Sequence, residues 1–69
     1  MTGTEHINAY GVRMTVYTRA DGISFEARVC GEGGWIYAVF YGQEARDDAL
    51  AHAPVVARRI HEARRKAFG

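Results

Sequence analysis

The apolar residues of this chain alternate with polar ones between residues 12 and 29, run without interruption over residues 35–41, and recur at intervals of three or four residues after that. Val12, Met14 and Val16 alternate with polar neighbours, and the same alternation returns from Ile23 to Val29. Successive side chains of a strand point to opposite faces, so this pattern is typical of strands with one face on a core and one in water. The first part of the chain is therefore predicted to form a sheet with these apolar residues inward.

Turn signals divide this part into three strands, at about residues 10–19, 23–30 and 35–41. Asp21-Gly22 ends the first strand, because Asp-Gly supplies the backbone freedom that a tight hairpin turn requires. Gly31-Glu32-Gly33-Gly34 separates the second strand from the third, and it lacks the Gly-Lys-Ser/Thr ending of a phosphate-binding loop. Consecutive strands joined by short turns predict a three-stranded antiparallel meander.

The third predicted strand, WIYAVFY at residues 35–41, has no polar position in its alternation. Either both of its faces are buried, or one face stays apolar and aromatic for a partner. A 69-residue chain buries only about 60% of its unfolded surface and has little left for a second covering layer. Tyrosine and tryptophan also carry polar atoms that a dry core would have to satisfy. We therefore expect Ile36, Ala38 and Phe40 to face the core, and Trp35, Tyr37, Val39 and Tyr41 to face outward.

Residues 43–68 are rich in helix formers. Pro54 lacks a backbone donor and clashes with the preceding turn, so we expect either a kink or two helices, at residues 43–52 and 54–67. The predicted fold class is α+β, with the order β-β-β-α in a single domain over residues 1–69. Apolar residues at intervals of three or four predict one stripe that lies on the sheet: Leu50, Ala53, Ala57, Ile60 and Ala63.

The outward positions of the predicted strands bring aromatic residues and arginines onto one face. Both types are enriched at the hot spots of protein interfaces, because they supply large buried area with fixed polar groups. The same side chains also suit the stacking of nucleic-acid bases, or they pack on one another across the strands. The candidate partner-binding residues on this face are Arg13, Tyr17, Glu26, Arg28, Trp35, Tyr37 and Tyr41.

Charge divides the chain near residue 53. Four arginines and seven carboxylates give residues 1–53 a net charge of −3, and five cations against Glu62 give residues 54–69 a net charge of +4. A basic segment of this kind marks a nucleic-acid contact, or it complements the negative end of the helix dipole. Its cations are Arg58, Arg59, Arg64, Arg65 and Lys66.

The composition, 48% hydrophobic and 25% charged, is that of a folded soluble domain. The first ten residues lack the basic and apolar regions of a signal peptide, and no apolar run approaches the roughly 18 residues of a membrane-spanning helix. We therefore expect a cytoplasmic protein without membrane contacts.

Signals for catalysis and for metal binding are weak. Cys30 is the single cysteine, so it has no partner for an internal disulfide, and Cys/His metal sites usually need a second thiolate nearby. His52 and His61 are nine residues apart, off the i, i+4 spacing that places two ligands on one helix face. Asp47 and Asp48 suit the positive N-terminal end of a helix. No nucleophile is paired with a base, and we expect no catalytic residue, metal or cofactor.

The predicted opening hairpin contains a series of short motifs: His6-Ile7-Asn8, Tyr10, Val16-Tyr17, the turn glycine Gly22 and Ala27-Arg28-Val29. Phe40-Tyr41-Gly42-Gln43 follows in compatible order at the helix entry. In these motifs, which lie within roughly residues 6–50, the chain resembles a family of small phage anti-CRISPR proteins that inhibit the type I-F CRISPR surveillance complex.

The resemblance implies a protein that acts without catalysis in the host bacterial cytosol. It would bind the Cas7-like backbone subunits along the guide RNA and block hybridisation of target DNA. Tyr17 matches a tyrosine that contributes to the interface in that family. Cys30 stands where the family has an acidic residue, which is a departure from its pattern.

Two other classes of function stay open. Three-stranded sheets backed by a helix also occur in DNA-binding domains that place the sheet in the major groove. Against this class stands the net charge of −3 over residues 1–53, since a face that neutralises phosphates should be basic. In the third class, the aromatic face pairs with a second copy of the chain across a two-fold axis.

Overall fold

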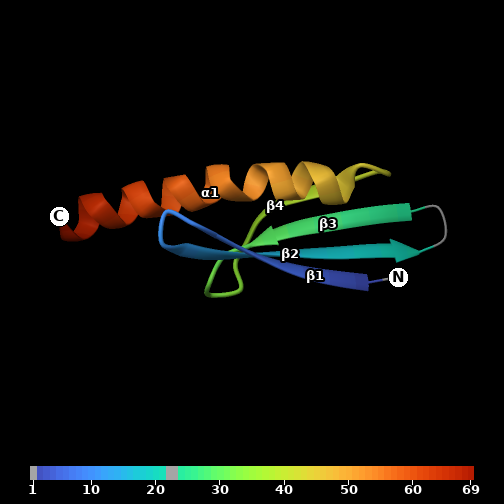
Figure 1. Cartoon of the computed structure of the whole chain (residues 1–69), viewed down its shortest axis with the longest axis horizontal. Helices are drawn as coiled ribbons and strands as arrows, with labels where there is room; N and C mark the ends of the chain where they lie inside the picture. The colour runs from blue at the N-terminus through green and yellow to red at the C-terminus, as the bar shows by residue number, and fades with distance from the viewer. Residues whose placement is uncertain (1, 22–23) are drawn as a thin grey trace.

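The computed structural model describes residues 2–21 and 24–69, and it contains one antiparallel sheet with one helix on one side (Figure 1). The strands are β1 (Thr2–Ala9), β2 (Val12–Asp21), β3 (Ser24–Cys30) and β4 (Ile36–Tyr41), and they neighbour one another in chain order. Helix α1 (Ala45–Phe68) follows. The predicted α+β class and the meander are confirmed. Gly22 and Ile23, the predicted turn glycine and the start of the second strand, lie outside the described residues.

The sheet has four strands rather than the three that the sequence predicts. Residues 2–9 form β1 and pair antiparallel with residues 12–19 of β2. Tyr10 and Gly11 make the two-residue turn between these strands, with φ values of 52° and 71°. Positive φ at both central positions is the type I′ geometry, whose twist matches that of the flanking strands. The expected strand start at Tyr10 is therefore wrong, because Tyr10 is a turn residue and β2 begins at Val12.

The core lies between one face of the sheet and α1. The apolar residues of the two central strands are buried as expected, and Phe25 packs half-buried against them. The helix contributes a line of alanines spaced four residues apart, which lets the helix approach the sheet closely because alanine is small. The core residues of the sheet are Val12, Met14, Val16, Ala27 and Val29, and those of the helix are Ala45, Ala49, Ala53, Val56 and Ala57. Cys30 is also buried, but on the other side of the sheet.

The start of β4 departs from the predicted alternation. Cys30 of β3 lies opposite Ile36, but its neighbour Val29 lies opposite Ala38, so Tyr37 is the extra residue of a β-bulge. Ala38 packs against the core, as does Phe40, which confirms their predicted inward direction. Ile36 was expected inward and is exposed instead, because the bulge reverses the alternation before Ala38.

α1 is one helix of 24 residues with Pro54 inside it, so of the two alternatives, a kink or a split into two helices, the split is wrong. Proline has no N–H, so the carbonyl of Leu50 loses its partner one turn ahead. Buried alanines lie on both sides of Pro54 and hold both halves of the helix on the same sheet, which offsets the lost hydrogen bond. Ala63, expected in the apolar stripe, is exposed, because the last turns of α1 extend past the sheet (Figure 1).

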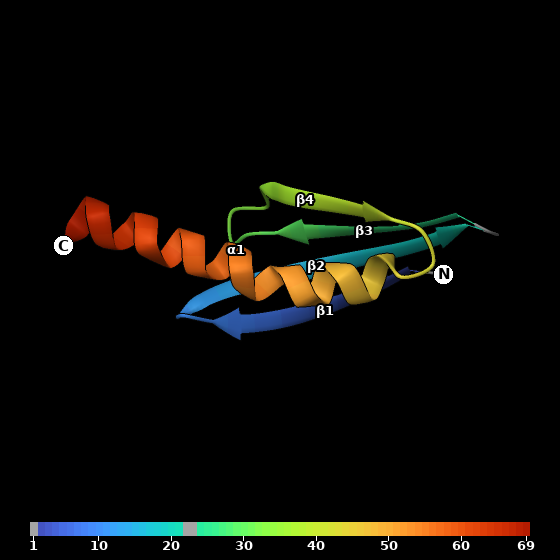
Figure 2. The same cartoon turned by 90° about the horizontal axis from the view of Figure 1, so that it is seen from above.

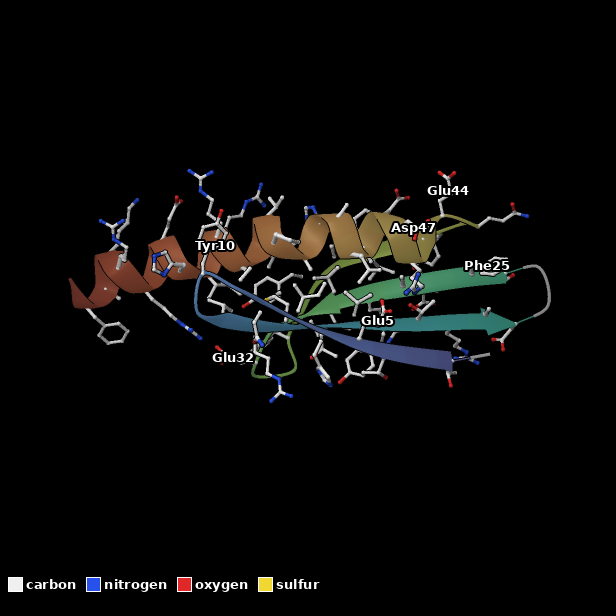
Figure 3. All side chains as sticks on the ribbon, in the orientation of Figure 1. Glu5, Tyr10, Phe25, Glu32, Glu44 and Asp47 are labelled. Carbon is white, nitrogen blue, oxygen red and sulfur yellow. The ribbon has the colours of Figure 1, made fainter. Side chains whose placement is uncertain are left out.

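Side-chain contacts at both ends and in the middle fix α1 along the strands. At the first turn of the helix, an ion pair reaches β1, and near the other end a second ion pair, with an N–O distance of 2.6 Å, reaches the β3–β4 turn. Between them, two histidines contact aromatic rings at centroid distances of 5.5 and 6.0 Å. In Figure 3, Tyr10 is labelled beside the second half of the helix and Glu32 below it. The four pairs are Arg46–Glu5, His52–Phe40, His61–Tyr10 and Arg64–Glu32.

Because Met14 is fully buried in the centre of this small core, the substitution Met14→Ala should lower the free energy of unfolding by about 2–5 kcal/mol. The control Val55→Ala removes an exposed apolar side chain of the helix and should change it by less than about 0.5 kcal/mol. Denaturant titration followed by circular dichroism measures both values. Equal losses in the two variants would contradict the described core.

Replacing Pro54 with alanine restores an N–H that the carbonyl of Leu50 can accept, so Pro54→Ala should raise the free energy of unfolding by about 1–3 kcal/mol. The same denaturant titration measures the change. A lower stability than that of the unmodified chain would mean that the half-buried proline ring contributes more through packing than the missing hydrogen bond costs.

Candidate interaction surface

The side of the sheet opposite α1 is covered by no other element of the described chain (Figure 1 and Figure 3). Side chains on this side are exposed or half-buried on all four strands, apart from the buried Cys30. We name this side the open face. Its exposed residues are Thr4, His6, Asn8, Arg13, Tyr17, Arg19, Arg28, Ile36, Val39 and Tyr41, with the half-buried Thr15 and Glu26 between them.

Strand register arranges the open face in rows that cross the sheet. Side chains directly opposite one another in an antiparallel sheet have Cβ atoms about 4.5–5.5 Å apart, so the members of a row touch. Tyr17 is 48% exposed and Tyr41 is 74% exposed, and the two tyrosines lie in adjacent rows. The face therefore offers a contiguous surface of aromatic, aliphatic and guanidinium groups. One row is Thr4, Tyr17, Arg28 and Val39, and the next is Arg19, Glu26 and Tyr41.

The charges of the open face are mostly paired along single strands. Arg28 forms an ion pair with Glu26, and Arg19 forms one with Asp21 at 2.9 Å, in each case two residues apart on the same side of a strand. Ion pairs between exposed side chains contribute little to stability. Each carboxylate therefore orients its arginine but leaves the guanidinium group available to other partners. Arg13 has no ion pair among the residues that the structure describes, and it leaves the face with a small positive excess.

Two of the seven predicted contact residues lie outside the rows of the open face, one on the side of α1 and one in the turn before β4. Tyr37 turns to the side of α1 because it is the bulged residue, and its ring lies over Gly31. A Cβ at Gly31 would come within 2.6 Å of the Tyr37 ring, so the ring depends on glycine there. Trp35 lies in the loop before β4, beside Gly33, and is 72% exposed. The five other residues lie on the open face as predicted, namely Arg13, Tyr17, Glu26, Arg28 and Tyr41.

The predicted basic patch lies on the far half of α1. Two of its arginines are tied to carboxylates within the chain, Arg58 to Glu62 at 3.2 Å and Arg64 to Glu32 at 2.6 Å. Arg65 and Lys66 fall in the last turn, where cations complement the helix dipole. The patch is therefore a separate surface, on the layer opposite the open face, and part of its charge has a structural role.

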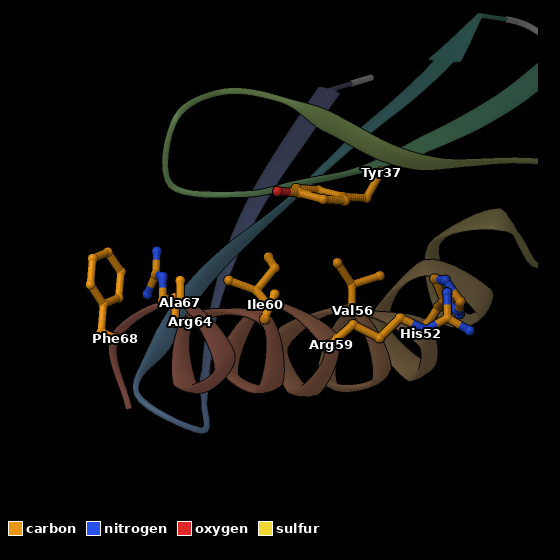
Figure 4. A pocket seen from close by; sticks show the side chains of 9 residues that line it. Tyr37, His52, Val56, Arg59, Ile60, Arg64, Ala67 and Phe68 are labelled. Carbon is orange, nitrogen blue, oxygen red and sulfur yellow. The ribbon is translucent and has the colours of Figure 1, made fainter.

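A groove of about 450 Å³ runs between β4 and the second half of α1 (Figure 4). Tyr37 forms one wall, and Val56 and Ile60 line the helix side. Phe68 lies at its outer end and is 89% exposed. The groove is the place where α1 does not fully cover the inner side of β4.

The sequence prediction missed several residues of the open face because it missed strand β1. Thr4, His6 and Asn8 line its edge, and His6 Nδ1 lies 3.2 Å from Thr15 Oγ1 across the strands. The alternation of Glu5, Ile7 and Ala9 toward the helix side is the signal that predicts this strand. Gly3 and the polar residues around it hid that signal.

The described residues hold no group of three or more histidine, cysteine or carboxylate side chains that could bind a metal ion. In the part of the chain that the structure describes, no helix is both long and apolar enough to cross a membrane. No family model, curated protein or solved structure matches this chain, so the open face has to be interpreted from its own geometry.

Burial raises the pKa of the Cys30 thiol, and the nearby Arg28 guanidinium acts in the opposite direction. The thiolate, which is the reactive form, is therefore scarce at neutral pH, and the side chain is shielded as well. Alkylation of Cys30 by iodoacetamide at pH 7 should be much slower in the folded chain than in denaturant. Equal rates in the two states would contradict the described burial.

Proposed function

We propose that this chain is a non-enzymatic binding module that uses the open face to contact a protein partner. The observation that carries the proposal is the exposure of Tyr17, Arg28 and Tyr41 together on a sheet face without a covering layer. Side chains of these types make the largest contributions to protein interfaces. Strand pairing fixes the backbone positions of these residues, so no backbone segment would have to be ordered there when a partner binds.

The partner that the sequence favours is a Cas7-like backbone subunit of a type I CRISPR surveillance complex. The resemblance of the opening hairpin to anti-CRISPR proteins supplies this candidate, and Tyr17, its matched tyrosine, lies in a central row of the open face. Cys30, at the position where that family is acidic, lies two residues from Arg28 on the same strand but is buried. Binding to this backbone subunit would block access of target DNA to the guide RNA in the bacterial cytoplasm.

A gel shift of labelled target DNA with a purified type I surveillance complex tests the proposal. Adding this protein should abolish the complex–DNA band, and a lane with DNA and this protein alone should show no shift. An unchanged complex–DNA band at saturating protein would contradict the proposed partner.

A matched pair of arginines tests which surface binds. Arg28 on the open face and Arg58 on the helix are both exposed, and each forms an ion pair with a glutamate on its own element. Arg28→Ala should raise the concentration needed for inhibition at least about tenfold, as expected for a hot-spot arginine. Arg58→Ala should leave it unchanged, and the reverse result would place the interface on the helix.

A nucleic-acid-binding module is the second candidate, because Arg13, Arg19 and Arg28 share the open face. The acidic residues behind the net charge of −3 lie partly elsewhere, including Glu5 on the helix side and Glu32 in a turn. This candidate predicts a shift in the lane without the surveillance complex, and an affinity that falls steeply with salt. A flat response of binding to salt would exclude it.

A further inference from the structure

One side of the β4 backbone faces no other strand of the described chain, because β4 is at the edge of the sheet. At the end of its pairing with β3, the Gly42 N–H donates to the Phe25 carbonyl at 3.1 Å. Hydrogen-bonded pairs alternate along antiparallel strands, so positions 40 and 38 also direct their N–H and C=O groups toward β3. Val39 and Tyr41 therefore direct theirs to the outer edge of the sheet.

The side chains of β4 leave this edge unprotected. Ile36–Tyr41 contains no charge, proline or glycine, whereas β1, at the other edge, contains Gly3 and Glu5. Charged residues and prolines are the usual means by which proteins block pairing between sheet edges. A strand that pairs with β4 would meet no charge that has to be desolvated.

The inner side of β4 is also incompletely covered. Figure 2 shows α1 over the middle of the sheet, with β4 clear of it. Ala38 and Phe40 are only half-buried, and the groove lined by Tyr37 and Ile60 adjoins them. An additional strand beside β4 would cover the exposed edge of Phe40.

We propose that β4 pairs antiparallel with β4 of a second copy of this chain, which joins the two sheets into one with both helices on the same side. An antiparallel edge is complementary to itself, because residues related by a two-fold axis exchange N–H and C=O groups. When Val39 lies opposite Tyr41 of the second copy, the outward N–H and C=O groups of both residues form hydrogen bonds. This register also places Phe40 against its own copy on the helix side.

Charge on the open face is compatible with this register. Val39 continues the row of Arg28, and Tyr41 of the second copy continues the row of that copy's Glu26. The charges nearest the seam in this joined row are therefore Arg28 on one side and Glu26 of the second copy on the other, which have opposite signs, and Arg19 of the second copy lies one strand further out. The dimer doubles the open face without covering it, so the inference does not depend on which partner that face binds.

Sedimentation equilibrium of the full chain tests the dimer. The unmodified chain should have the mass of two chains. Val39→Pro removes one outward N–H and no β3–β4 hydrogen bond, and it should raise the dimer dissociation constant at least about tenfold. Val39→Glu, which puts a charge on the edge opposite Arg28, should do the same.

The control Asn8→Glu puts the same charge on the open face of β1 opposite Arg13 and should leave the dimer intact. A monomeric unmodified chain, or a dimer that survives both Val39 variants, would overturn the proposal.

Amide hydrogen exchange of the unmodified chain gives a second test that needs no variant. The amides of Val39 and Tyr41 should exchange slowly, at rates that rise on dilution as the dimer dissociates. The amides of Ala38 and Phe40 point to β3 and should be protected at all concentrations. Fast, concentration-independent exchange at Val39 and Tyr41 would show that the edge is open and would overturn the proposal.

Discussion

The close packing of one alanine-lined helix on one side of the sheet is the interaction on which the rest of this structure depends. Ala45, Ala49, Ala53 and Ala57 recur every four residues and are fully buried against β2 and β3. Their small side chains let Met14 and the valines of the strands fill the space between the layers. The helix keeps its length through Pro54 because this packing acts on both sides of it.

A single helical layer covers only one face of the sheet, and residues 2–21 and 24–69 form no further element over the other face. The consequence for function is direct, because strand pairing then fixes Tyr17, Arg28 and Tyr41 in adjacent rows on a rigid, accessible surface. The ion pairs of Arg28 and Arg19 run along single strands and hold the guanidinium groups in place while leaving them exposed. The proposed function therefore uses the face of the sheet that the core does not need.

Sequence periodicity was sufficient to predict the parts of the structure in which burial follows the regular alternation of a single strand. The alternation of β2 and β3 and the inward direction of Ala38 and Phe40 could be predicted because burial selects one face of each strand. Features that depend on non-local geometry could not be predicted from periodicity. Tyr10 at positive φ, the bulge at Tyr37 and the continuity of α1 through Pro54 each result from packing or pairing with a distant segment. The bulge alone removed Tyr37 from the predicted surface and added Ile36 to it.

Radical footprinting of tyrosines can test the proposed contact between the open face and the partner. Tyr17 and Tyr41 lie on this face. Tyr10 is about as exposed as Tyr17, but it lies in the β1–β2 turn against His61 of the helix. Oxidation would be compared in the free chain and in the chain bound to a purified surveillance complex. If the partner binds the open face, Tyr17 and Tyr41 should be protected and Tyr10 should be unchanged. Protection of Tyr10 with no change at Tyr17 and Tyr41 would contradict the proposed contact.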